Sequence, residues 1–144
     1  MPRIALAAAL LSIVASLVAC GSDSSDDKPT KAEYIAKADA ICSKANGEIN
    51  AEAQKQFGNK QPTDAQVTQF TRDVVLAKIE EQSDDLKDLD KPEGDDDELN
   101  ALYASLDKSI DTAKKTDGTL DNSTFADANA KAKAYGLKVC GADS

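Results

Sequence analysis

Hydrophobic residues recur at intervals of three and four from Thr30 onward, which is the spacing of one face of an α-helix. Four stretches carry this pattern, and they predict helices over about residues 30–57, 63–89, 95–117 and 122–139. No stretch alternates hydrophobic and polar residues with the period of two that is typical of a half-buried strand. The pattern therefore predicts an all-α helical bundle domain over residues 30–141.

Local signals mark the ends of these helices. Thr30 with Glu33, and Thr63 with Gln66, have the spacing of a capping box, in which side chains bond free backbone N–H groups of the first turn. Glycine or proline then separates each predicted helix from the next. Four amphipathic helices with short connections favour an antiparallel, up-down-up-down four-helix bundle.

The N-terminal segment has a different pattern. Arg3 is the only charge among the first 19 residues, and residues 4–18 are apolar apart from two serines. This run is too short to cross a bilayer comfortably, since a spanning helix needs about 20 apolar residues. It fits the apolar region of a secretory signal peptide, which is followed by small residues at the cleavage site. We therefore expect residues 1–19 to be a signal peptide.

The apolar run ends in the sequence LVAC at residues 17–20, followed by Gly21, and this resembles the lipobox of bacterial lipoproteins. The resemblance implies cleavage before Cys20, a diacylglyceryl group on its thiol and an N-terminal amine open to acylation. Two acyl chains hold a protein stably at a membrane, whereas one binds only marginally. The resemblance thus implies a lipid anchor at the extracytoplasmic face of the cell membrane. A plain signal peptide followed by a chance cysteine is the alternative.

The charge of the chain limits its partners. The formal net charge is −9, and it becomes −10 when Arg3 leaves with the signal peptide. Nucleic acid is excluded as a partner on this basis, because its phosphates require clusters of lysine and arginine. Residues 20–29 are polar and acidic and predict a flexible linker, so the lipid on Cys20 must hold the protein at the membrane. An electrostatically steered protein partner would be basic.

The chain has three cysteines. If lipid consumes Cys20, Cys42 and Cys140 remain as the one intrachain pair, and the oxidising exterior favours a disulfide between them. Two free buried thiols are the alternative. On antiparallel neighbouring helices, such a bridge predicts a register that places Phe57 beside Phe125.

Two segments at the ends of the domain carry a second resemblance. Residues 34–42 read YIAKADAIC and residues 135–141 read YGLKVCG. They are similar to the ends of the exported helical domains in a loose group of small, uncharacterised actinobacterial lipoproteins and membrane-anchored proteins. The resemblance covers only the two ends of the domain. It implies an actinobacterial envelope and a helical fold, and it carries no activity.

The inventory of reactive side chains argues against catalysis. The chain has no histidine, and its domain cysteines are expected to be oxidised, so Ser-His and Cys-His pairs are excluded. We expect no catalytic residue, no cofactor and no metal site. Zinc would lack ligands, and the acidic run at residues 95–98 lacks the spacing of a calcium loop. That run is better explained as the N-terminus of a helix, where carboxylates complement the macrodipole.

Two classes of function remain. The first is a non-enzymatic binding, interaction or structural module of unknown specificity, tethered to the envelope. The alternative is a carrier of an apolar ligand or lipid within the helical bundle. A preformed cavity with a few convergent polar groups would favour the carrier, whereas a closed, alanine-rich core would favour the module.

Overall fold

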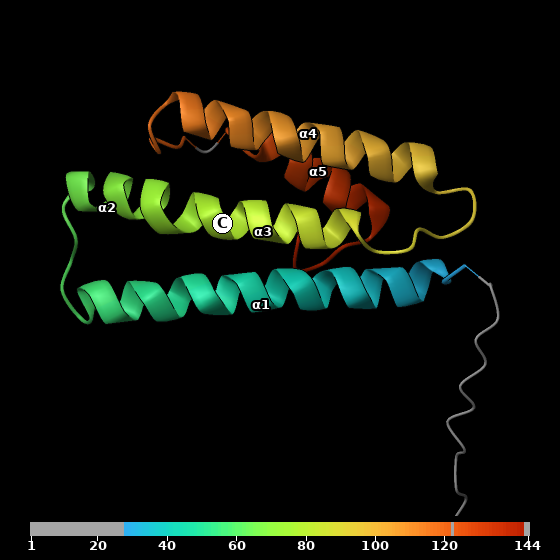
Figure 1. Ribbon diagram of the computed structural model, residues 1–144, viewed down its shortest axis with the longest axis horizontal. Helices are drawn as coiled ribbons and strands as arrows, with labels where there is room; N and C mark the ends of the chain where they lie inside the picture. Colours follow the sequence, from blue (N-terminus) through green and yellow to red (C-terminus); the bar gives the residue numbers. More distant parts are fainter. Residues whose placement is uncertain (1–27, 122, 143–144) are drawn as a thin grey trace, which may run out of the picture.

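The computed structural model describes residues 28–121 and 123–142, and all regular secondary structure in these residues is helical (Figure 1). The elements are α1 (Lys31–Phe57), α2 (Asp64–Phe70), a π-helical turn (Thr71–Val75), α3 (Leu76–Lys87), α4 (Asp96–Lys115) and α5 (Ala126–Tyr135). Because α2, the π-turn and α3 follow one another directly, they form one continuous helical segment. The all-α class is confirmed. The expected signal peptide, Cys20 and linker residues 20–27 lie outside the described residues.

Both predicted capping boxes are present. At the start of α1 the Thr30 side chain accepts the N–H of Glu33, and the Glu33 carboxylate accepts the N–H of Thr30 at 2.8 Å. At the start of α2 the Thr63 side chain and Gln66 form the same reciprocal pair, with the Thr63 N–H 2.9 Å from Gln66 Oε1. These bonds satisfy N–H groups that have no partner within the helix.

The start of α4 carries the predicted acidic residues, with Asp96, Asp97 and Glu98 in its first turn. Asp95 is the residue before the first turn, but its side chain makes no capping hydrogen bond. Its carboxylate instead accepts the hydroxyl of Tyr135 at 2.6 Å and lies 4.0 Å from the ammonium group of Lys31. Asp95 therefore links the start of α4 to the end of α5, through Tyr135, and to the start of α1, through Lys31.

The helices pack in a chain of neighbours. In Figure 1, α1 lies beside the α2–α3 segment, α4 lies on its other side, and α5 lies behind. Helix α1 packs on α3, α3 on α4, and α4 on α5, whereas α5 makes at most a marginal backbone approach to α1. The last helix, α5, therefore does not pack along the length of α1 to close the bundle.

The predicted register between the first and last helices is wrong for this reason. Phe57 stacks edge-on against Phe70, with ring centroids 5.3 Å apart, while Phe125 packs with Leu106 and Ile110. The last helix is also shorter than predicted, because it ends at Tyr135.

Gly136 ends that helix. It adopts a left-handed conformation with φ 111°, which glycine tolerates because it has no Cβ. The N–H of Leu137 then bonds the carbonyl of Ala132 at 3.0 Å, and the N–H of Gly136 bonds Lys133 at 3.1 Å. These two bonds form a Schellman motif, after which the chain leaves the helix axis.

The apolar core falls into two clusters. The larger one surrounds the disulfide half-cystine Cys42 and the tyrosines of α1, α4 and α5, and it includes Leu86, Leu99 and Leu102. The smaller one contains Leu106, Ile110 and Ala128, with Ile79 and Phe125 against it.

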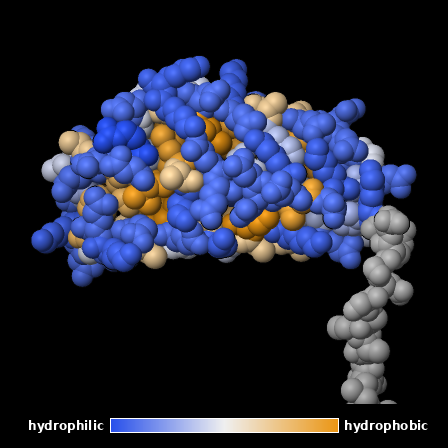
Figure 2. All heavy atoms as spheres, viewed as in Figure 1, coloured by the Kyte–Doolittle hydropathy of each residue, from blue (hydrophilic) through white to orange (hydrophobic). Residues whose placement is uncertain are grey.

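The surface has the opposite character. The face in Figure 2 is mostly hydrophilic, with hydrophobic residues visible between the helices. Among the described residues, no helix combines the length and apolarity needed to cross a membrane.

Candidate functional site

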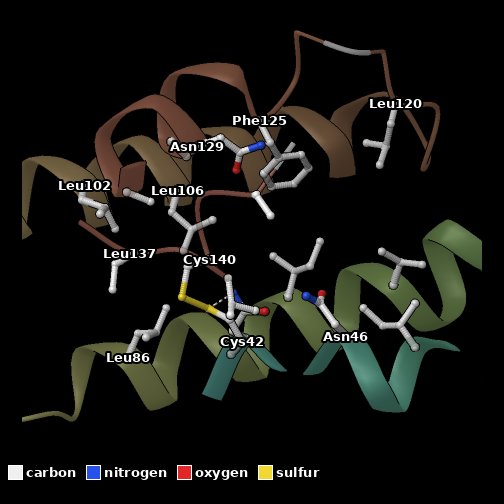
Figure 3. A pocket seen from close by; sticks show the side chains of 18 of the residues that line it. Cys42, Asn46, Leu86, Leu102, Leu106, Leu120, Phe125, Asn129, Leu137 and Cys140 are labelled. Atoms are coloured by element: carbon white, nitrogen blue, oxygen red, sulfur yellow. Dashed lines mark hydrogen bonds between the residues drawn. A yellow bond between two sulfur atoms is a disulfide. The ribbon is translucent and has the colours of Figure 1, made fainter. Parts of the chain in front are cut away.

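A cleft of about 500 Å³ opens on the side of the bundle where α5 and α1 do not pack together (Figure 3). Its walls come from α1, the end of the π-turn, α3, α4, the connection from α4 to α5, α5 and the C-terminal segment 137–142. Its volume lies in the range of clefts that bind small molecules. The cleft runs past both core clusters, since Leu102 and Leu137 of the larger one and Leu106 and Phe125 of the smaller one contribute to its walls.

Small residues on α5 help to leave this space open. Ala128 and Ala132 stand one turn apart on the side of α5 that lines the cleft. Ile79 and Leu86 of α3 also line the cleft, and a methyl group fills little of the space between the helices. The small side chains of α5 therefore line the cleft while belonging to the core clusters.

The π-turn sets which side chains of the second helical segment reach the cleft. The N–H of Leu76 bonds the carbonyl of Thr71, five residues earlier, so the turn contains one extra residue. Before the turn, Phe70 faces Phe57 of α1, and at the end of the turn Val75 contributes to the cleft. The sequence does not predict this turn, because hydrophobic periodicity does not distinguish it from a continuous α-helix.

The disulfide predicted between Cys42 and Cys140 is present, with 5.3 Å between the two Cα atoms. It joins α1 to the C-terminal segment and lies in the cleft wall (Figure 3). Cys42 is only 1% exposed, and its sulfur accepts the side-chain N–H of Gln82 at 3.2 Å. The bridge therefore fixes the distance between two walls of the cleft at one end.

Asp39 holds the same C-terminal segment through its backbone. Its carboxylate accepts the N–H groups of Lys138 at 3.1 Å and Val139 at 2.8 Å, and lies 3.4 Å from the nitrogen of Cys140. These N–H groups have no partner within a helix or strand, because the segment is neither. Sequence reasoning missed this residue, although its place one turn before Cys42 offered a signal.

The two segments that carry the second resemblance thus meet in space. Besides the disulfide and the Asp39 contacts, the rings of Tyr34 and Tyr135 pack edge-on with centroids 5.7 Å apart. The Tyr34 hydroxyl is hydrogen-bonded to that of Tyr103, which donates to the carbonyl of Leu86 at 2.8 Å. Burial raises the pKa of Tyr34 and, more strongly, that of Tyr103. This end of the α1–α5 gap is closed.

Four side-chain amides supply the polar groups of the cleft. They belong to Asn46 and Asn50 of α1, Gln82 of α3 and Asn129 of α5. Asn46 and Asn129 lie on opposite walls in Figure 3, and their amides point toward the space between. Apart from Gln82, these amides make no hydrogen bond to another group within the described residues. Each can therefore both donate and accept a bond to an occupant or to water.

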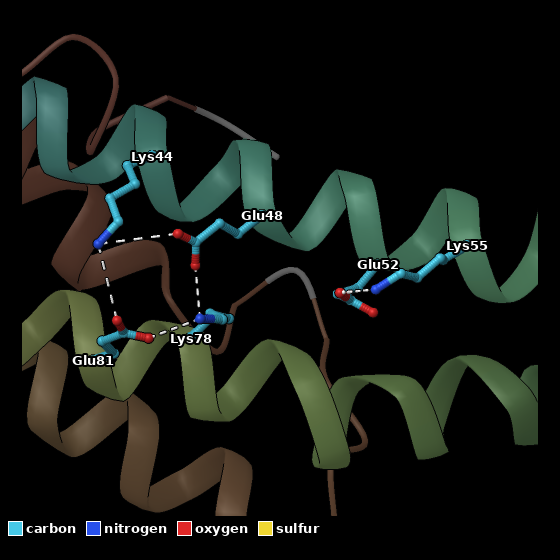
Figure 4. Close-up of polar contacts among 6 residues, drawn as sticks. All are labelled: Lys44, Glu48, Glu52, Lys55, Lys78 and Glu81. Carbon is cyan, nitrogen blue, oxygen red and sulfur yellow. Dashed lines mark hydrogen bonds and ion pairs between the residues drawn. The ribbon is translucent and has the colours of Figure 1, made fainter.

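The charged residues of α1 and α3 lie elsewhere. Lys78 bridges Glu48 at 2.7 Å and Glu81 at 2.8 Å, and Lys44 lies 4.0 Å from both carboxylates (Figure 4). Lys44 follows Cys42 by two positions, which places it about 200° around the helix from the cleft. The network joins α1 to α3 outside the cleft and leaves the cleft wall uncharged.

The described residues contain no group of three or more acidic, cysteine or histidine side chains that could hold a metal ion. Asp95, at the start of the acidic run, is engaged by Tyr135 and Lys31. Both domain cysteines are oxidised. The cleft can therefore enclose apolar surface and offer neutral hydrogen bonds.

Comparison with known proteins adds no relative to this picture. No family model matches the chain, and neither curated proteins nor solved structures give a match. The case for a function therefore depends on the geometry and chemistry of the cleft.

Proposed function

We propose that this protein is a non-enzymatic lipoprotein, anchored through lipid on Cys20 at the extracytoplasmic face of the cell membrane, and that its helical domain carries an apolar ligand. The observation that supports the carrier is the cleft of about 500 Å³ with mostly apolar walls and a few amide groups. Apolar surface gains free energy when an occupant replaces water against it. From the sequence alone, the carrier was the alternative to an interaction module. A preformed cleft favours the carrier, because the module was expected to have a closed core.

The proposal includes an antiparallel, up-down-up-down arrangement of the four helical segments after the signal peptide and linker. The short connections and the packing of α1 on α3, α3 on α4 and α4 on α5 support this arrangement. In such a bundle the first and last helices must meet to close the ring. Here they meet only at the tyrosine and disulfide end, so the ligand would enter between α1 and α5.

Docking of a basic protein partner is the alternative, and the net charge of −9 favours it. The two functions respond differently to salt. Association steered by surface charge slows as ionic strength rises, whereas binding in an uncharged cleft changes little.

The carrier is tested by what the protein holds when it is purified from its own membrane. Organic extraction followed by mass spectrometry should recover a lipid or other apolar molecule bound in addition to the covalent anchor. Asn50→Trp places an indole in the cleft wall and should reduce the amount recovered. Ala51→Trp is the matched control, because Ala51 is exposed on the same helix and lies outside the cleft. Equal recovery from both variants, or none from the unmodified protein, would contradict the carrier.

The anchor is tested separately. Metabolic labelling with a palmitate analogue should label the unmodified chain and leave Cys20→Ala unlabelled, because the thiol is the expected attachment point. Equal labelling of both chains would exclude lipidation at Cys20.

A further inference from the structure

The cleft differs from the rest of the chain in charge. Charged residues make up 30% of the sequence, yet none of the nineteen residues that line the cleft in the described part of the chain is charged. The charges of the neighbouring helices pair with one another outside it, as in the network of Lys44, Glu48, Lys78 and Glu81. The cleft therefore offers no partner for a charged ligand group.

Because its lining has no charged residue, the cleft disfavours charged ligands. A charged group moved from water into an apolar cleft loses its hydration, and the loss is compensated only by an opposite charge or several hydrogen bonds. An anionic headgroup would also meet a chain of net charge −9. A cationic group would find its carboxylate partners only outside the cleft.

The amides define what the cleft accepts instead. Asn46 and Asn129 face each other across the gap, and Asn50 lies one turn after Asn46 on α1. The side chains of these three residues make no hydrogen bond within the described residues. An amide offers donors and acceptors without net charge, which suits a hydroxyl, ester or amide group on the ligand. The remaining walls are hydrocarbon and suit an alkyl chain.

We infer that the occupant is an uncharged amphiphile, with an alkyl chain along the apolar walls and a hydroxyl or ester group between Asn46 and Asn129. This rests on the proposed carrier function and names its class of ligand. Selection arises from the lining, so it distinguishes a glycerol monoester from a fatty acid of the same chain length. The acid is ionised at neutral pH, and the monoester is not.

The test uses the full chain with Cys20→Ala, which removes the attachment point of the acyl chains that would compete with the probe. An uncharged naphthylamine fluorophore is bound first and displaced at pH 8 by three ligands of equal chain length: a glycerol monoester, a fatty acid and an alkylamine. We expect the monoester to displace the probe at concentrations about 10-fold lower than either charged ligand. The order should persist at high salt, because the lining and not the screened surface charge sets it.

The amides are tested by substitution. Asn46→Leu and Asn129→Leu should each weaken the monoester by about 3- to 10-fold, the effect of losing one hydrogen bond, and leave the affinity of the probe nearly unchanged. Asn59→Leu is the control, since Asn59 is exposed and outside the cleft. Equal affinity for the acid and the monoester, strongest binding of the amine, or unchanged monoester binding in both variants would overturn this inference and leave the carrier standing. Failure of the probe and all three ligands to bind would overturn the carrier itself.

Discussion

The three tyrosines of the chain come together between α1, α4 and α5, although 101 positions separate the first from the last. Tyr34 and Tyr103 share a hydrogen bond, and Tyr135 binds Asp95. Each hydroxyl therefore has a partner despite its burial, which avoids the cost of an unsatisfied polar group. The edge-on contact of Tyr34 with Tyr135 adds aromatic packing between α1 and α5.

This cluster predicts a loss of stability at alkaline pH. Burial raises the pKa of Tyr34 and Tyr103 in the folded protein, whereas an unfolded tyrosine ionises near pH 10. Their contribution is complete below pH 10 and is lost as pH rises toward the folded pKa, because the unfolded state releases protons first. Each tyrosine contributes a slope of at most about 1.4 kcal/mol per pH unit. Urea unfolding from pH 8 to pH 11 measures it, and Tyr34→Phe should flatten the curve. Identical slopes would contradict the assignment.

Asp39 predicts a local effect on the C-terminal segment. Asp39→Ala removes the acceptor of the Lys138 and Val139 N–H groups and should destabilise the protein by about 1–3 kcal/mol. Asp39→Asn keeps one carbonyl acceptor and should cost less. Hydrogen exchange at the amides of residues 138–140 reports the contact directly. Unchanged protection in Asp39→Ala would show that the carboxylate does not hold this segment.

At the scale of elements, helix ends determine the shape of the bundle as much as the helices do. The Schellman motif at Gly136 turns the chain toward α1, and a similar motif ends α4, where Asp117 and Gly118 are left-handed. Gly118 is buried against the π-turn, so the end of α4 approaches the second helical segment closely.

Replacement of glycine by alanine should have opposite effects on stability at Gly118 and at Gly47. A Cβ on Gly118 would lie 2.9 Å from the backbone nitrogen of Arg72 and the carbonyl of Thr68, and φ is 80°. Gly118→Ala should therefore destabilise by about 1–3 kcal/mol. Gly47 lies within α1 with open space around it, so Gly47→Ala should stabilise by about 0.5–1 kcal/mol. Chemical denaturation of both variants measures the pair. Equal effects would contradict the close approach at Gly118.

At the scale of the whole molecule, the disulfide connects residues 98 positions apart and holds a wall of the cleft. A cross-link over this length stabilises mainly by restricting the unfolded chain. The effect is important here because the core has few aromatic residues and no tryptophan.

Replacing both cysteines should lower both the stability of the protein and the affinity of the cleft for the naphthylamine probe. Cys42→Ser with Cys140→Ser should cost about 2–5 kcal/mol and lower Tm by roughly 10 °C or more. The C-terminal segment is then held only by Asp39 and its packing, so the cleft should bind the naphthylamine probe more weakly below the new Tm. Calorimetry and probe titration measure the two effects. A double variant with unchanged stability would show that the bridge adds no constraint to the domain.

The sequence by itself determined the features that depend on neighbouring residues. The four helical stretches follow from apolar spacing, and their first residues follow from Thr30 and Thr63 with their capping partners. The pairing of Cys42 with Cys140 followed from cysteine number and compartment, without any knowledge of geometry. Each of these signals acts within a few residues or by elimination, so a single chain is enough to find it.

Only the tertiary structure decided the cleft. The predicted register assumed that the last helix runs along the first, but Gly136 ends α5 and the disulfide lies in the segment beyond it. The role of Asp39, the uncharged lining and the facing amides of Asn46 and Asn129 depend on segments far apart in sequence. Whether alanines produce a closed core or an open cleft depends on how closely two helices approach. That distance is set by every contact in the bundle at once, because packing is a property of the whole fold.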